Sequence, residues 1–143
     1  MEIVLALMIT LAIEVNIFIF LERKNIFLWL VATGMNIVLN VGMNILLYHM
    51  PTEFWYWFTL WVYEILTFII EGFVVFAFFR YKLVKCLLVS LIANAASFLV
   101  GFILNQIPQN RTIQIILLIA FSVIYLVGFG ITTYRYSKNR FAD

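Results

Sequence analysis

The fold of this chain is decided by residues 26 to 48, which read IFLWLVATGMNIVLNVGMNILLY. The run contains no charged residue, and it exceeds the roughly 20 residues that a helix needs to cross a membrane. Its most polar side chains are Asn36, Asn40 and Asn44, spaced four residues apart. Because an α-helix turns by about 100° per residue, these amides share one face. The run therefore predicts a membrane-spanning helix with a polar stripe.

The composition of the whole chain excludes a water-soluble globule. Hydrophobic residues make up 66% and charged residues 11% of the sequence, whereas soluble domains contain about 45–50% and about 25%. The single cysteine, Cys86, excludes an internal disulfide, and no Cys/His cluster indicates zinc or an iron–sulfur centre. We therefore expect an integral membrane protein without a cofactor, apart from a bound cation.

Short polar separators divide the sequence into several apolar runs. The predicted spans are residues 3–21, 26–48, 54–79, 83–105 and 112–134. They predict an all-α, polytopic transmembrane helical bundle of five spans that forms a single transmembrane domain over residues 1–143. A bundle of four spans, with one run lying at the interface or re-entering the membrane, is the alternative.

The positions of the basic residues predict the orientation. Eight of the nine Lys and Arg residues lie in the first loop, the third loop and the tail, and only Arg111 lies on the opposite side. The positive-inside rule then places the N-terminus outside and the C-terminus in the cytoplasm. Trp55, Tyr56, Trp57 and Trp61 are typical of an interfacial aromatic belt. The expected location is the plasma (inner) membrane of a prokaryote.

Polar side chains form stripes on neighbouring predicted helices. Glu64 and Glu71, seven residues apart, share a face of the third helix, and Ser90, Asn94 and Ser97 share a face of the fourth. Together with Glu14 of the first helix and the asparagines of the second, they form the predicted polar core or ion- or proton-binding site. Its candidate residues are Glu14, Asn36, Asn40, Asn44, Glu64, Glu71, Ser90, Asn94 and Ser97.

The energy of burying acids in lipid predicts that these stripes face inward. A carboxylate at the centre of a membrane helix costs about 2.5–3.5 kcal/mol on insertion scales. The predicted spans contain no central Lys or Arg to pair with Glu14, Glu64 or Glu71. Protonation, hydrogen bonds from Asn and Ser, hydration in a cavity or a bound cation must therefore offset the cost.

A purely structural role is the alternative for the same residues. Asn, Ser and Gly on facing helices often join them, and each interhelical hydrogen bond contributes about 0.6 kcal/mol. Such contacts are dry, whereas ion or solute binding requires a hydrated cavity. Glu64 and Glu71 favour ion or solute binding, because amide side chains would join the helices without the cost of burying an acid.

Three functions fit these features, and ion- or solute-linked transport is favoured. Carboxylate and amide oxygens suit hard cations, and a buried glutamate can carry a proton. The second is an auxiliary or assembly subunit of a larger membrane complex. The third is an intramembrane lipid-modifying enzyme with Glu64 or Glu71 as base and Asn94 as hydrogen-bond donor. It is the weakest of the three, because the sequence contains no metal triad, GxSxG turn or phosphate loop. The expected partners are the lipid bilayer and a second copy or a membrane subunit, and no nucleic acid.

Overall fold

The computed structural model describes residues 2–19, 25–106 and 110–140, and all regular structure in these ranges is helical. The helices in order are α1 (Glu2–Thr10), a π-helical turn η1 (Leu11–Val15), α2 (Asn16–Ile19), α3 (Ile26–Tyr48), α4 (Glu53–Phe79), α5 (Leu83–Asn105) and α6 (Arg111–Arg140). The fold class is therefore all-α, as predicted.

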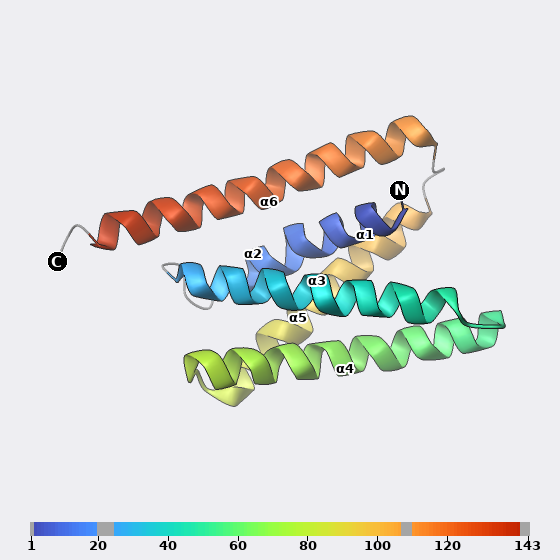
Figure 1. Cartoon of the computed structure of the whole chain (residues 1–143), viewed down its shortest axis with the longest axis horizontal. Coiled ribbons are helices and arrows are strands. Elements are labelled where there is room, and N and C mark those ends of the chain that lie inside the picture. Colours follow the sequence, from blue (N-terminus) through green and yellow to red (C-terminus); the bar gives the residue numbers. More distant parts are fainter. Residues whose placement is uncertain (1, 20–24, 107–109, 141–143) are drawn as a thin grey trace.

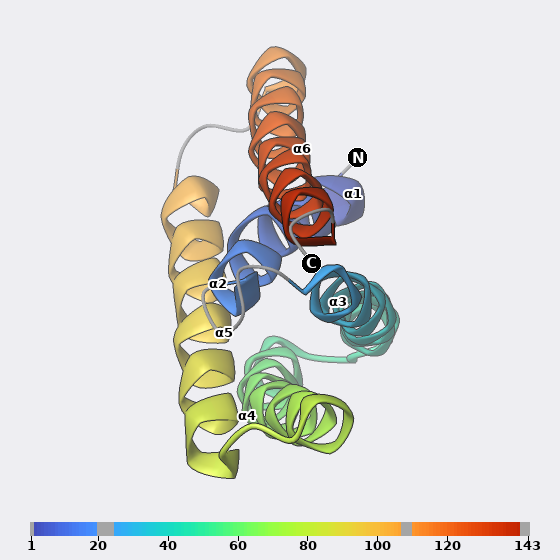
Figure 2. The same cartoon turned by 90° about the vertical axis from the view of Figure 1, so that its left-hand side faces the viewer.

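The segment α1–η1–α2 lies in the middle of the bundle. In the end-on view it is surrounded by α3, α5 and α6, while α4 lies between α3 and α5 (Figure 2). Its side chains Val15 and Phe18 are completely buried. Lipid by itself does not drive an apolar helix inward. Hydrogen bonds of Glu14 with Ser97 and of Thr10 with Asn40 instead join this segment to α5 and α3.

In the described part of the chain, four helices are long and apolar enough to cross a membrane: Ile26–Tyr48, Glu53–Phe79, Leu83–Leu104 and Arg111–Lys138. Much of their outer surface consists of exposed large apolar side chains, which suits lipid rather than water. The chain is thus a membrane-spanning helical protein by length and composition.

The first helical segment is shorter than the others. Its apolar part, Val4–Ile19, has fewer than 18 residues, and it covers about 24 Å against a hydrocarbon core of about 30 Å. The start of α1 and the end of α6 lie at opposite ends of the bundle (Figure 1), as an odd number of passes requires. The fifth crossing and the orientation of the termini stay predictions.

The helix bounds agree closely with the predicted spans at 26–48, 54–79 and 83–105. The predicted span 112–134 is only part of α6, which continues to Arg140 because the polar tail contains no Pro or Gly to end it. The predicted span 3–21 is interrupted by the π-helical turn, and residues 20 and 21 lie outside the described residues.

Local capping explains where several helices begin. The Asn25 side chain accepts hydrogen bonds from the amides of Phe27 and Leu28 at the start of α3. Thr52 accepts from the amide of Trp55 at the start of α4. These bonds satisfy donors that the first helical turn leaves free.

Helices α4 and α5 pack closely at Gly72. A β-carbon added at Gly72 would lie 2.7 Å from Leu87 Cδ2 and 3.0 Å from Leu87 Cα. Only glycine therefore permits this approach of the two backbones. The close contact fixes the facing stripes of α4 and α5 against each other.

An apolar cluster fills the half of the bundle near the ends of α2 and α4. It consists of Leu11, Val15, Phe18, Leu28, Trp29, Ala32, Val75, Cys86 and Ala93. This half contains the end of α4 and the start of α5, which the basic residues predict to face the cytoplasm.

Candidate functional site: a polar cavity inside the bundle

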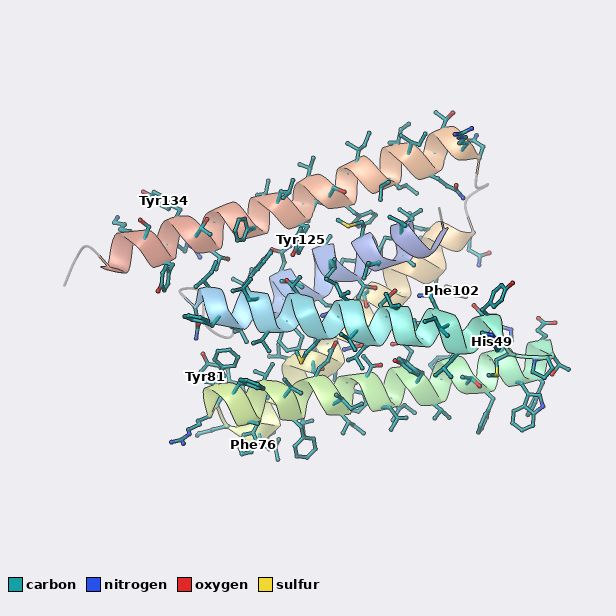
Figure 3. The ribbon with its side chains drawn as sticks, in the orientation of Figure 1. His49, Phe76, Tyr81, Phe102, Tyr125 and Tyr134 are labelled. Carbon is teal, nitrogen blue, oxygen red and sulfur yellow. The ribbon has the colours of Figure 1, made fainter. Side chains whose placement is uncertain are left out.

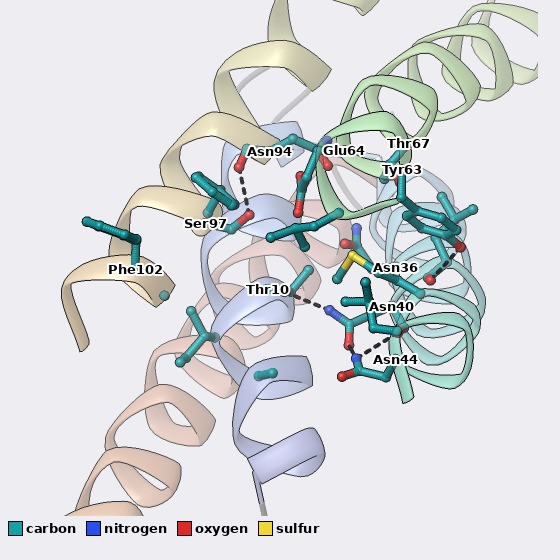
Figure 4. A pocket seen from close by; sticks show the side chains of 18 of the residues that line it. Thr10, Asn36, Asn40, Asn44, Tyr63, Glu64, Thr67, Asn94, Ser97 and Phe102 are labelled. Atoms are coloured by element: carbon teal, nitrogen blue, oxygen red, sulfur yellow. Dashed lines mark hydrogen bonds between the residues drawn. The ribbon is translucent and has the colours of Figure 1, made fainter. Parts of the chain in front are cut away.

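A cavity of about 410 Å³ lies between α1, α3, α4 and α5 (Figure 4). Leu47, Tyr56 and Trp57 line it near the α3–α4 turn, and Glu14 and Glu64 line it deeper in the bundle. The turn belongs to the side that the sequence predicts to be outside. The cavity therefore extends from the predicted outer side towards the apolar cluster.

Two acids lie at the inner end of the cavity. Glu14, only 2% exposed, accepts a hydrogen bond at Oε1 from the Ser97 hydroxyl. Its Oε2 is buried and has no hydrogen-bond partner among the described residues. Glu64 is half-buried and points into the space between Asn94 and Asn36 (Figure 4).

The third acid, Glu71, lies behind the cavity wall. Its side chain is completely buried, and Oε2 accepts hydrogen bonds from Ser90 Oγ at 2.9 Å and from Asn94 Nδ2 at 2.6 Å. The other oxygen, Oε1, has no partner among the described residues. Because Asn94 also lines the cavity, its amide connects the cavity to this buried acid.

The titratable side chains at the inner end of the cavity are all acidic. Glu14 interacts electrostatically with Glu71, and Glu64 acts on both. None of the residues that line the cavity in the described part of the chain is Lys or Arg. A positive charge placed at the inner end would therefore be attracted by each of these acids that is ionised, and it would favour their ionised form.

The asparagine stripe of α3 forms one wall. Asn40 donates a hydrogen bond to Thr10 Oγ1 at 3.0 Å, and Asn44 donates to Asn40 Oδ1 at 3.0 Å. Asn36 donates to the backbone oxygen of Ala32 at 3.0 Å. All three asparagines line the cavity, so polar groups follow its length.

The structure brings the predicted site residues together in two layers. The cavity is lined by Glu14, Asn36, Asn40, Asn44, Glu64, Asn94 and Ser97. Glu71 and Ser90 form the layer behind it. Whether any of them binds an ion, a proton or a solute stays a prediction.

Thr33 lies three residues before Asn36 and so on nearly the same face of α3. Its hydroxyl nevertheless lies 3.1 Å from the hydroxyl of Tyr125, which is labelled on α6 in Figure 3. The width of the stripe, about 80° on the helix, lets its first residue contact a different neighbour.

Aromatic residues of the cavity were not predicted as part of it. Tyr56 and Trp57 line the cavity although their position indicated only an interfacial belt. Tyr63 and Phe98 also line it, and the Tyr63 hydroxyl donates to the Leu39 backbone oxygen at 2.7 Å. The sequence carries no signal for these roles. The same aromatic residue types occur at a membrane interface and in the wall of a cavity, so residue type cannot distinguish the two positions.

The π-helical turn was also missed. It holds Glu14 within residues Leu11–Val15, and such turns frequently occur at functional sites. No Pro or Gly marks this turn in the sequence.

The described residues contain no group of three His, Cys, Asp or Glu side chains arranged to hold a metal ion. No known protein-family model, curated protein or solved structure matches this chain. Its function is therefore argued from the cavity itself.

Proposed function

We propose that this protein performs ion- or solute-linked transport across the membrane, with the cavity as its binding site. The observation that supports the proposal is the cavity of about 410 Å³ with Glu14 and Glu64 at its inner end. Ligand pockets in proteins usually measure about 300–1,000 Å³.

The cavity distinguishes this proposal from a purely structural role of the polar residues. Side chains that only join helices would close on each other and leave no space. Here some pairs do join helices, such as Asn40 with Thr10. Glu64, in contrast, projects into the space between the helices (Figure 4), at a cost that binding of a cation or proton would offset.

The arrangement supports access from one side at a time. The asparagine stripe and the acids are continuous from the α3–α4 turn to the middle of the bundle. Beyond them the apolar cluster around Val15, Trp29 and Val75 closes the opposite half. Release to the predicted cytoplasmic side would require this cluster to open, as alternating access demands.

Asn94 supplies a connection between ligand and buried acid. Its amide lines the cavity and donates to Glu71. A ligand that turns this amide would change the hydrogen bonding of Glu71, which is a physical route for coupling to a proton.

The test is transport by the purified full chain in liposomes. Proton flux is read by a pH-sensitive dye in the lumen, and sodium flux by radioactive sodium. Each flux is measured alone and with a gradient of an aromatic solute. The three solutes are the cation benzyltrimethylammonium, the neutral benzyl alcohol and the anion benzenesulfonate. We expect protein-dependent flux of at least one species, reduced at least tenfold by Glu64→Gln.

Glu53→Gln is the matched control, because Glu53 is an exposed acid in the first turn of α4 and does not line the cavity. Background flux in all proteoliposomes would argue against transport by this chain alone. Co-purification of a membrane protein in fixed ratio, with flux only in the complex, would favour the auxiliary-subunit alternative.

A further inference from the structure

We propose that the ligand of the cavity is an organic monocation, whose charged group lies at Glu14 and Glu64 and whose apolar body contacts the aromatic wall. This inference rests on the proposed function, because it names the class of solute for the same site. It makes the cavity a selective site and not a passage for small ions in general.

The sign of the ligand's charge follows from the inner end of the cavity. Glu14 and Glu64 line it, Glu71 lies behind it, and no lining residue of the described chain is basic. An anion would meet these carboxylates without a compensating charge. A cation is attracted, and the attraction is strong where water is displaced by apolar walls.

Glu14 is the more deeply buried of the two lining acids. It is 2% exposed, and its Oε2 is buried without a hydrogen-bond partner among the described residues. A buried carboxylate oxygen without a partner is costly. Because Oε2 is not open to the cavity, a cationic group there would compensate it through its electrostatic field and not by direct contact.

The size of the cavity favours an organic cation over a metal ion. A metal ion uses only the few oxygens that converge within about 2–2.6 Å of it, so it would leave most of this cavity unfilled. A cavity of about 410 Å³ instead matches a small organic molecule. The charged group of such a molecule occupies only the inner end of the cavity. The rest of the cavity then accommodates an apolar body.

The walls between the acids and the α3–α4 turn suit such a body. Tyr63 and Phe98 lie next in sequence to Glu64 and Ser97, and all four line the cavity. Aromatic faces attract organic cations through their quadrupoles. Aliphatic side chains, among them Leu39, Leu47 and Leu60, complete this wall.

The first experiment measures binding by isothermal titration to the full chain in lipid nanodiscs. The probe is benzyltrimethylammonium, whose charge does not depend on pH. Benzyl alcohol and benzenesulfonate carry the same ring with no charge or with a negative charge. We expect the cation to bind at least tenfold more tightly than either control, without competition from millimolar sodium or magnesium.

Variants locate the binding site. Glu64→Gln should weaken binding of benzyltrimethylammonium at least tenfold, because it removes an acid from the cavity. Glu71→Gln removes an acid that does not line the cavity, so it should weaken binding less than threefold. Equal binding of the three probes, or equal effects of the two variants, would overturn the inference.

A second measurement leaves every acid in place. Gly101 lines the cavity, and a β-carbon added there meets no atom within 4 Å. Gln106→Cys is the control, because Gln106 caps the C-terminal end of α5, is exposed and does not line the cavity. The native Cys86 is completely buried, so wild type gives the background.

Gly101→Cys is labelled with 2-(trimethylammonium)ethyl methanethiosulfonate and with 2-sulfonatoethyl methanethiosulfonate. Rates are normalised to those of a free thiol. We expect the cationic reagent to be favoured at least tenfold at Gly101→Cys and not at Gln106→Cys. An equal or reversed preference would overturn the inference even if the Glu64 variant fails to fold.

The results separate this inference from the proposed function. Selective binding of the cation without flux in liposomes would keep the ligand class and refute transport. Flux of protons or sodium without selective binding of the cation would keep transport and refute the ligand class.

Discussion

The hydrogen bond between Glu71 and Asn94 provides the sharpest test of the bundle's interior. The single variants are not diagnostic, because removing a buried acid also removes its burial cost and leaves a void. A double-mutant cycle of Glu71→Ala and Asn94→Ala cancels both effects and isolates the interaction between the side chains.

The structure sets the magnitude of the coupling. Asn94 Nδ2 lies 2.6 Å from Glu71 Oε2, and the two side chains are 5% and 0% exposed. Interhelical hydrogen bonds in membrane proteins average about 0.6 kcal/mol and reach about 1.7 kcal/mol. A short bond between two buried groups belongs in the upper part of this range, so we expect a coupling of about 1–1.7 kcal/mol.

Unfolding of the purified protein in mixed micelles, followed by far-ultraviolet circular dichroism during titration with dodecyl sulfate, gives the four free energies. The control cycle pairs Glu71→Ala with Ser122→Ala, because Ser122 bonds within α6, a helix whose described residues do not contact α4. Distant side chains without a shared partner should couple by less than about 0.3–0.5 kcal/mol. A Glu71–Asn94 coupling no larger than this control would refute the placement of α4 against α5.

Further predictions concern packing, the cavity wall and the topology. Gly72→Ala should lower the free energy of unfolding by about 1–3 kcal/mol in the same titration, because the added β-carbon would lie 3.0 Å from Leu87 Cα. Gly101→Ala is the control and should cause no loss, because a β-carbon there has no atom within 4 Å. Tyr63→Phe removes the 2.7 Å bond to the Leu39 oxygen and should cost about 0.6 kcal/mol; a loss above about 2 kcal/mol would mean that another contact was disturbed. Reporter enzymes fused to each end should show the N-terminus outside and the C-terminus in the cytoplasm, and both ends on one side would refute five spans.

The pattern of the sequence determined the helices of the bundle. An apolar run that meets lipid has to form a helix, because no water is available for its backbone groups. For this reason α3 begins and ends where the composition predicted, at Ile26 and Tyr48. Periodicity also identified the polar faces, since seven of the nine predicted site residues line the cavity and the other two lie directly behind it.

Only the tertiary structure decided how these faces meet. Periodicity gives the direction of a side chain around its own helix, but neither the distance between two helices nor their rotation. The approach of α4 and α5 at Gly72, the contact of Thr33 with Tyr125 and the position of Glu71 behind the wall all depend on those two quantities.

The cavity itself shows the same division. The energy of acids in lipid predicted that Glu14 and Glu64 face the interior, but not whether space would remain beside them. That space depends on how every helix packs with its neighbours, which is a property of the whole bundle. The sequence alone thus determined which groups turn away from lipid, whereas the folded packing decided that they surround a cavity of about 410 Å³.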